Sequence, residues 1–133
     1  MTAHILVIED NAANLELIRY LLSYSGYTVL QARDGTEGVD MARREQPDLV
    51  ICDLQLPELD GYEVLQSLRE DPTSAATIIV AVTAFSMPND KQKVITVGFN
   101  GYLSKPIDPE MFVQQIEAYL PLELRAPRPV TNT

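Results

Sequence analysis

Short apolar runs alternate with amphipathic stretches along most of the 133-residue chain. Apolar runs of four to eight residues that are rich in β-branched side chains predict buried strands. A continuous run is typical of a strand in a parallel sheet that is covered on both faces. Five strands are expected on this basis, at Ile5–Ile8, Tyr27–Gln31, Asp48–Cys52, Thr77–Val82 and Gly101–Ser104.

Apolar residues at helical spacing follow each of these strands, and capping signals indicate where the helices begin. Asp34 and Asp60 each precede a helix that carries an acid three residues later. The fourth helix, from about Pro88 to Val97, has a thin apolar stripe, so we expect it to pack loosely. Asp108–Glu110 predicts the start of the last helix, with a cap followed by a proline at the first helical position.

The resulting pattern is a strand followed by a helix, repeated five times. Alternating strands and helices predict an α/β fold with a parallel sheet and right-handed crossovers. The length suits one domain, which we place at residues 1–121. Residues 122–133 are rich in proline and show no periodic pattern, so they are expected to form a C-terminal tail or linker.

Composition narrows the classes of function. A formal net charge of -9 argues against a nucleic-acid-binding surface, because such a surface needs positive charge to attract phosphates, and no basic patch stands out. No apolar run approaches the roughly 20 residues that a membrane span needs. The single cysteine, Cys52, lies inside an apolar strand and is interpreted as a core residue. With no signal peptide visible, one cysteine is consistent with a reducing cytoplasm.

Polar residues occur at the ends of four predicted strands. These residues are Glu9, Asp10, Asp53, Thr83 and Lys105. In a parallel sheet the C-terminal ends of all strands lie at one edge, where open α/β sheets bind their ligands. Three carboxylates close together repel one another, and Mg²⁺ would relieve that repulsion. The sequence therefore predicts a site for a hard cation beside a lysine.

Each of these residues also has an ordinary structural interpretation. Asp53 suits a turn, and Thr83 could cap a turn. Glu9 and Asp10 could be an acid pair that the dipole of the following helix favours at its N-terminus. Lys105 alone is more often a solvated charge. All of these interpretations would have to hold together for the site to be absent.

The motifs together resemble the receiver domain of two-component response regulators, in the CheY-like superfamily. The resemblance covers about Ile5 to Leu120. It is closest in pattern to stand-alone regulators of the DivK type, and it implies a flavodoxin-like (βα)5 fold with strand order 2-1-3-4-5. The matching segments are Glu9-Asp10-Asn11, Asp53 with Pro57 and Gly61, Val82-Thr83-Ala84-Phe85-Ser86-Met87, and Tyr102 with Lys105-Pro106.

The resemblance implies a role for each acidic and basic residue of the site. Asp53 would accept a phosphoryl group, and Lys105 would pair with the phosphoryl oxygens. Asp10, Asp53 and the backbone carbonyl of Gln55 would bind Mg²⁺ or Mn²⁺, with Glu9 reaching the metal through water. Such a site neutralises the charge that develops during phosphoryl transfer.

The resemblance also implies which residues respond to the phosphoryl group. Thr83 and Tyr102 would act as the switch, and a cis peptide would join Lys105 to Pro106. Gln55 and Phe85 occupy the positions that tune hydrolysis in this family. A bulky Phe85 should hinder the attacking water, so we predict a long-lived phosphoryl group that Phe85→Ala would shorten.

The expected function is a phosphorylation-dependent signalling switch that changes protein–protein interactions and is not a turnover enzyme. The implied partners are a histidine kinase or histidine phosphotransfer protein, and a downstream protein that binds the fourth helix, fifth strand and fifth helix. Neither nucleic acid nor membrane is expected as a partner, and homodimerisation stays open. Whether the chain stands alone or was cut from a longer protein also stays open.

Three other classes of function were weighed against the switch. An aspartyl phosphatase would carry a second acid two residues after its nucleophile, where this chain has Gln55. A flavin or nucleotide binder would place a phosphate-binding loop after the first strand, where Glu9 and Asp10 would repel phosphate. A receiver-like binding module that works without phosphate is the remaining alternative.

Overall fold

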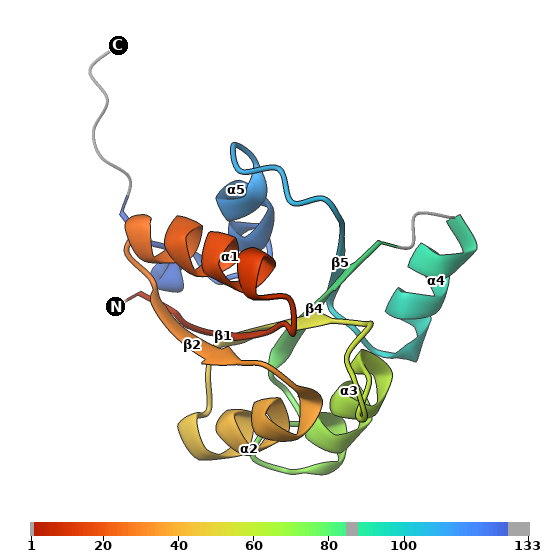
Figure 1. The fold of residues 1–133 in the computed structure, drawn as a ribbon. Coiled ribbons are helices and arrows are strands. Elements are labelled where there is room, and N and C mark those ends of the chain that lie inside the picture. The colour runs from red at the N-terminus through yellow and green to blue at the C-terminus, as the bar shows by residue number, and fades with distance from the viewer. Residues whose placement is uncertain (1, 85–87, 128–133) are drawn as a thin grey trace.

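The computed structural model describes residues 2–84 and 88–127, which form one sheet with helices on both faces (Figure 1). The elements occur along the chain in the order β1 (His4–Ile8), α1 (Ala12–Tyr24), β2 (Thr28–Ala32), α2 (Gly35–Glu45), β3 (Leu49–Asp53), α3 (Gly61–Glu70), β4 (Ile78–Thr83), α4 (Pro88–Val97), β5 (Gly101–Ser104), α5 (Phe112–Glu117) and the 3₁₀ helix η1 (Leu122–Leu124).

The strands pair in parallel in the order β2-β1-β3-β4-β5, which confirms the predicted fold class and strand order. The order of the strands reverses between β1 and β3. Ligands of open α/β sheets bind beyond the C-terminal ends of the strands at such a reversal. Asp53 is the last residue of β3, and Glu9 directly follows β1.

Helices α1 and α5 cover one face of the sheet, and α2, α3 and α4 lie on the other (Figure 1). Alternate residues of a strand point to opposite faces. Ile5 and Val7 of β1 therefore join the core beneath α1 and α5, whereas Leu6 and Ile8 join the core beneath α2 and α3. Both faces are buried, which explains why the strands appear in the sequence as continuous apolar runs.

The predicted caps of α2 and α3 are present. The side chain of Asp34 accepts a hydrogen bond from the N–H of Glu37, and Asp60 forms a reciprocal capping box with Glu63. Each of these side chains satisfies a backbone donor that has no partner within the helix.

The predicted start of the last helix was wrong. Helix α5 begins at Phe112, and its N-cap residue makes no side-chain capping hydrogen bond. Asp108 instead closes a turn that precedes the helix, because its Oδ1 accepts from the N–H of Glu110 and its carbonyl oxygen accepts from the N–H of Met111. A short polar side chain that bonds to the backbone two residues later favours a turn over a helix.

Residues 122–127 carry structure of their own. The N–H of Ala3 donates to the carbonyl oxygen of Leu124, and Ala126 is buried against the core beneath α1 and α5. The hydroxyl of Tyr27 accepts a hydrogen bond from the N–H of Ala126 and donates to the carboxylate of Glu117. This part of the segment is therefore joined to the domain through both backbone and side-chain contacts.

Among the helices of residues 2–84 and 88–127, none has the combined length and apolar character that a membrane crossing requires.

Candidate functional site at the C-terminal edge of the sheet

Asp53 lies at the end of the central strand with only 3% of its surface exposed. Its Oδ1 accepts a hydrogen bond from the N–H of Gln55 at 2.9 Å. The loop then folds back tightly, since the N–H of Gly61 donates to the carbonyl oxygen of Leu54 at 3.1 Å. A Cβ atom on Gly61 would lie 2.7 Å from the carbonyl oxygen of Asp53. Only glycine fits this approach without a shift of the backbone that carries Asp53.

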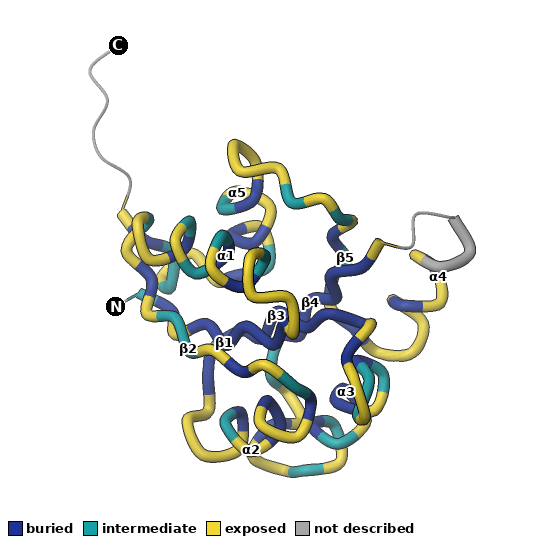
Figure 2. The backbone as a smooth tube through the Cα atoms, in the orientation of Figure 1, coloured by how far each residue is buried: buried dark blue, intermediate teal, exposed yellow. Residues whose placement is uncertain are grey.

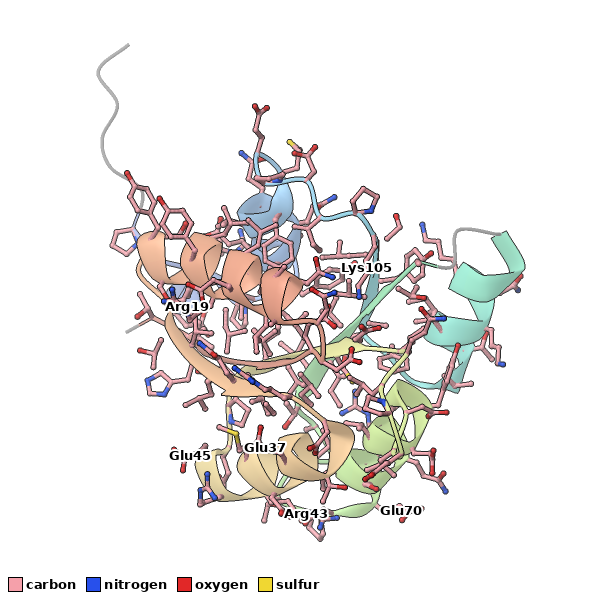
Figure 3. All side chains as sticks on the ribbon, viewed as in Figure 1. Arg19, Glu37, Arg43, Glu45, Glu70 and Lys105 are labelled. Carbon is pink, nitrogen blue, oxygen red and sulfur yellow. The ribbon has the colours of Figure 1, made fainter. Side chains whose placement is uncertain are left out.

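Lys105 reaches Asp53 from the end of β5. Its backbone N–H donates to the carbonyl oxygen of Thr83 at 2.8 Å, which holds the segment beside β4. Its Nζ lies 2.7 Å from Asp53 Oδ2 and 2.9 Å from Glu9 Oε1. Figure 3 labels Lys105, whose side chain turns toward the ends of the central strands. The peptide bond between Lys105 and Pro106 is cis.

Glu9 and Asp10 differ in their surroundings although they are neighbours in the chain. Glu9 is 2% exposed, and its Oε2 accepts a hydrogen bond from the N–H of Asn11 at 3.3 Å. Asp10 is exposed. One carboxylate oxygen from each of Glu9, Asp10 and Asp53 lies within 4.8 Å of the others. The three acids predicted to converge therefore do so.

The charges of the site influence one another strongly. Burial raises the pKa of Glu9 to about 7, and a hydrogen bond with Asp53 acts in the same direction. Burial lowers the pKa of Lys105, but its hydrogen bonds to Asp53 and Glu9 outweigh that effect and leave its pKa raised. The ammonium group is therefore held in its charged form, and Glu9 takes up a proton more readily than an ordinary glutamate does.

The donor set fits a hard divalent cation. Carboxylate oxygens are the ligands that Mg²⁺ prefers, and an exposed Asp10 leaves room for the waters that Mg²⁺ retains. Burial is the main cause of the raised pKa of Glu9, and its crowding against Asp53 adds to the shift despite the nearby Lys105. A bound cation would remove that crowding.

The remaining predicted residues lie around this cluster. Thr83 is fully buried as the last residue of β4, and Tyr102 of β5 is half-buried against the core beneath α2 and α3. Gln55 is exposed and contacts Asp53 through its backbone. Phe85, the other residue expected to tune phosphoryl lifetime, lies outside the described residues.

One feature of the site was not anticipated from the sequence, whereas the interpretation of Cys52 as a core residue is confirmed. Glu9 was assigned only an outer role toward a metal, yet it is a direct ion-pair partner of Lys105. Its position immediately after the apolar run Ile5–Ile8, which is buried, was the available signal. Cys52, next to Asp53, is buried, and burial raises the pKa of its thiol, which keeps it protonated and unreactive.

Comparison with known proteins assigns this arrangement to one family. The family model described as "Response regulator receiver domain" matches residues 5–117. The chain is 40% identical over 120 residues to the polar-differentiation response regulator DivK of Brucella ovis, covering 90% of this chain and 98% of the relative. The DivK protein of Brucella anthropi is 39% identical over the same length, with the same coverage of both chains.

Solved structures show the same fold. The chemotaxis response regulator CheY4 of Vibrio cholerae matches with a TM-score of 0.85 and 28% identity, over 90% of this chain and 100% of that one. The receiver domain of sensor histidine kinase PA1611 from Pseudomonas aeruginosa matches with a TM-score of 0.81 and 30% identity, over 90% and 98% of the two chains. That structure has a magnesium ion coordinated in its active site cleft.

Proposed function

The chain belongs to the response regulator receiver domain family, and we propose that it accepts a phosphoryl group on Asp53. Receiver domains are signalling switches of two-component systems and not classical turnover enzymes. The observation that carries the proposal is the position of the Lys105 ammonium, 2.7 Å from Asp53 and 2.9 Å from Glu9, beside a third acid. Residues from the ends of β1, β3 and β5 thus lie together, and the ammonium of Lys105 faces the carboxylate that would carry the phosphoryl group.

In the proposed reaction an Asp53 carboxylate oxygen attacks the phosphorus of a phosphohistidine. A P–O bond forms as the P–N bond breaks, and the imidazole leaves with the electron pair of the broken bond. Both oxygens of Asp53 already have partners, Gln55 N–H and Lys105 Nζ, which orient the carboxylate. Lys105 then transfers its ammonium contact to a phosphoryl oxygen. Because phosphoryl transfer depends mainly on alignment and charge neutralisation, this chain needs no further nucleophile or base.

Receiver domains bind Mg²⁺ in the active site. In this chain Asp10, Asp53 and the backbone carbonyl of Gln55 would hold the ion, and Glu9 would contact it through water. The bound cation would offset the charge of the incoming phosphoryl group. Glu9 must lose its proton for that role, which links its raised pKa to metal binding.

The phosphoryl group adds a charge of about -1.5 to -2 and several hydrogen-bond acceptors at Asp53. We assign Thr83 and Tyr102 as the residues that respond, because Thr83 ends the strand next to β3 and its carbonyl oxygen holds Lys105. Movement of either residue would displace α4 and β5, the surface that we propose for a downstream protein. Gln55 and Phe85 are proposed to set the lifetime of the phosphoryl group.

The phosphoryl donor is proposed to be a histidine kinase or a histidine phosphotransfer protein in the cytoplasm. A donor of this kind presents a phosphohistidine at the exposed Asp10 side of the site. The same residues would catalyse both uptake of the phosphoryl group and its slow hydrolysis. Homodimerisation after phosphorylation is compatible with the proposed output surface. A measurement of the oligomeric state of the phosphorylated protein tests it.

Intact-mass measurement tests the proposal. Incubation with Mg²⁺ and acetyl phosphate should add one phosphoryl group to the wild type, and EDTA should prevent this addition. Asp53→Asn should gain nothing, whereas Asp40→Asn, which alters an exposed acid of α2, should behave as the wild type. A folded wild type that binds Mg²⁺ but gains no mass would refute phosphorylation and favour a phosphate-independent binding module.

A further inference from the structure

We infer that Arg69 is a positioning residue that holds the C-terminal end of α4 in place while phosphorylation acts on the other end of that helix. The inference rests on the proposed function of Asp53. It adds that the C-terminal end of α4 stays in place when phosphorylation moves the rest of the helix. It comes from a cluster of contacts at the opposite edge of the sheet from Asp53. We call this cluster, made of Arg69, Ala75, Thr77, Gly98 and Asn100, the Arg69 clamp.

Arg69, near the end of α3, donates to four acceptors in two other segments. Nη1 donates to the carbonyl oxygens of Ala75 and Thr77, at 3.1 and 2.6 Å, in the connection before β4. Nη2 donates to the carbonyl oxygen of Gly98 at 3.2 Å and to Asn100 Oδ1 at 2.8 Å, just beyond α4. A planar guanidinium can serve several acceptors at defined angles, which an ammonium group cannot do in the same way.

Asn100 extends the clamp into the sheet. Its Oδ1 also accepts a hydrogen bond from the N–H of Ile79 at 2.8 Å, and its own N–H donates to the carbonyl oxygen of Ile79 at 2.8 Å. The segment between α4 and β5 is thereby bound both to β4 and to α3. Gly98, with a φ of +124°, ends the helix at this point and starts the return to β5.

Along the part of α4 whose side chains the structure describes, Val94 is buried and Lys93 Nζ lies 5.0 Å from the centre of the Tyr62 ring. From Lys91 to Val97 only Val94 is buried, and Figure 2 shows this part of the helix largely as exposed. Ile95 and Val97 are each 46% exposed. A surface pocket of about 380 Å³ lies along α3 beside the end of α4, and it is lined by Tyr62, Leu65, Gln66, Arg69, Glu70 and Val97. A helix held firmly at one end, with open space along one side, can tilt more easily than it can translate.

The site lies at the other end of this helix. Thr83 ends β4 at the phosphorylation edge, and the chain returns to the opposite edge of the sheet by way of α4. A displacement at Thr83 therefore acts on the beginning of α4, while the Arg69 clamp retains its end. Without the clamp the same displacement would shift the whole helix and the start of β5. The movement would then no longer be confined to the beginning of α4.

A brace that only adds stability makes a different prediction. Removing such a brace would lower the free energy of unfolding of the whole domain. It would not alter how α4 responds to phosphorylation. The hydrogen exchange of three amides distinguishes the two interpretations. The N–H groups of Gly98, Phe99 and Asn100 bond to Ile95, Val94 and Ile79, so they report directly on the clamp.

The experiment is hydrogen exchange of the full chain, with and without Mg²⁺ and acetyl phosphate. In the wild type, phosphorylation should change exchange in residues 91–94 by at least threefold and leave residues 98–100 within twofold. In Arg69→Lys, residues 98–100 should exchange at least tenfold faster even without phosphate. Phosphorylation of Asp53 should stay within twofold of the wild type by intact mass, while the response of residues 91–94 falls by more than half.

Arg43→Lys is the matched control. Arg43 of α2 forms a partly exposed ion pair with Asp71, and it lies far from Lys105 in Figure 3. Asn100→Ala removes one acceptor of the clamp and should reproduce the loss of response in a milder form. A phosphorylated Arg69→Lys protein with wild-type exchange at residues 98–100, or with an undiminished response at 91–94, would refute the inference alone. A wild type that gains no phosphoryl mass would instead refute the proposed function.

Discussion

The Nζ of Lys105 lies 2.7 Å from Asp53 Oδ2, although the two residues are 52 positions apart in the chain. The contact exists because β3 and β5 both flank β4 and run in the same direction, so their C-terminal ends share one edge. Glu9 completes the arrangement from β1. One cation thus faces two buried carboxylates, and this imbalance of charge underlies the chemistry and the pH behaviour of the site.

Lys105→Ala should lower the rate of Asp53 phosphorylation by about 100-fold, because the site loses the group that faces the developing charge. The rate is measured by intact mass during incubation with Mg²⁺ and acetyl phosphate. Lys91→Ala, an exposed substitution on α4, should leave the rate unchanged. A Lys105→Ala protein that is folded and phosphorylated at the wild-type rate would show that Lys105 has no part in the transfer.

The stability of the Mg²⁺-free protein should fall as the pH rises from about 5 to 8. The pKa of Glu9 is raised from 4.5 to about 7 on folding, so between these values the folded protein binds more protons than the unfolded chain. The lost stability amounts to about 3 kcal/mol for this group. Urea denaturation in EDTA at a series of pH values should show this decline in the wild type but not in Glu9→Gln.

Mg²⁺ should stabilise the folded protein more at high pH than at low pH, which is opposite to the pH trend of the Mg²⁺-free protein. The ion favours the deprotonated acids, so its stabilising effect on the folded protein should grow as the pH rises through 7. Denaturation in saturating Mg²⁺ therefore separates metal binding from the effect of pH alone. Equal stabilisation by Mg²⁺ at pH 5.5 and pH 8 would argue against a metal site that includes Glu9.

Gly61→Ala should disturb the loop that carries the phosphoacceptor. The added methyl group would lie 2.7 Å from both the carbonyl oxygen of Asp53 and the Cα of Leu54, so one backbone segment must shift. A cost of about 1–3 kcal/mol in unfolding free energy is expected, together with slower phosphorylation. Gln66→Ala, an exposed change on the same helix, provides the control. Wild-type values for both measurements would mean that the loop adapts without cost.

Tyr27→Phe should destabilise the protein without affecting phosphorylation. The lost hydroxyl bridges the buried carboxylate of Glu117 and the N–H of Ala126, and leaving the buried N–H of Ala126 unsatisfied costs about 1–3 kcal/mol. Limited proteolysis should also cut residues 121–127 faster. Tyr20→Phe removes a hydroxyl from an exposed, stacked ring and should change neither result. Equal stability of the two variants would contradict the role assigned to Tyr27.

Local signals in the sequence were sufficient for most of the secondary structure. The buried runs around Ile51 and Val80 indicated strands because a parallel sheet hides both faces of each strand. Asp34 and Asp60 indicated helix starts because their side chains bond to amides three residues away. Asp108 misled the prediction for the same physical reason, since a turn uses the same kind of short-range bond.

The sequence by itself also determined that acids and a lysine would meet at one edge, because parallel strands leave no other place for their C-terminal ends. Only the tertiary structure decided that Glu9 is buried against Lys105 while Asp10 is exposed, since adjacent side chains take opposite surroundings once the sheet is packed. It likewise brought Arg69 to its four acceptors, three of which are backbone carbonyl oxygens. Every residue has such an oxygen, so no residue type in the sequence marks where a guanidinium will find several of them together.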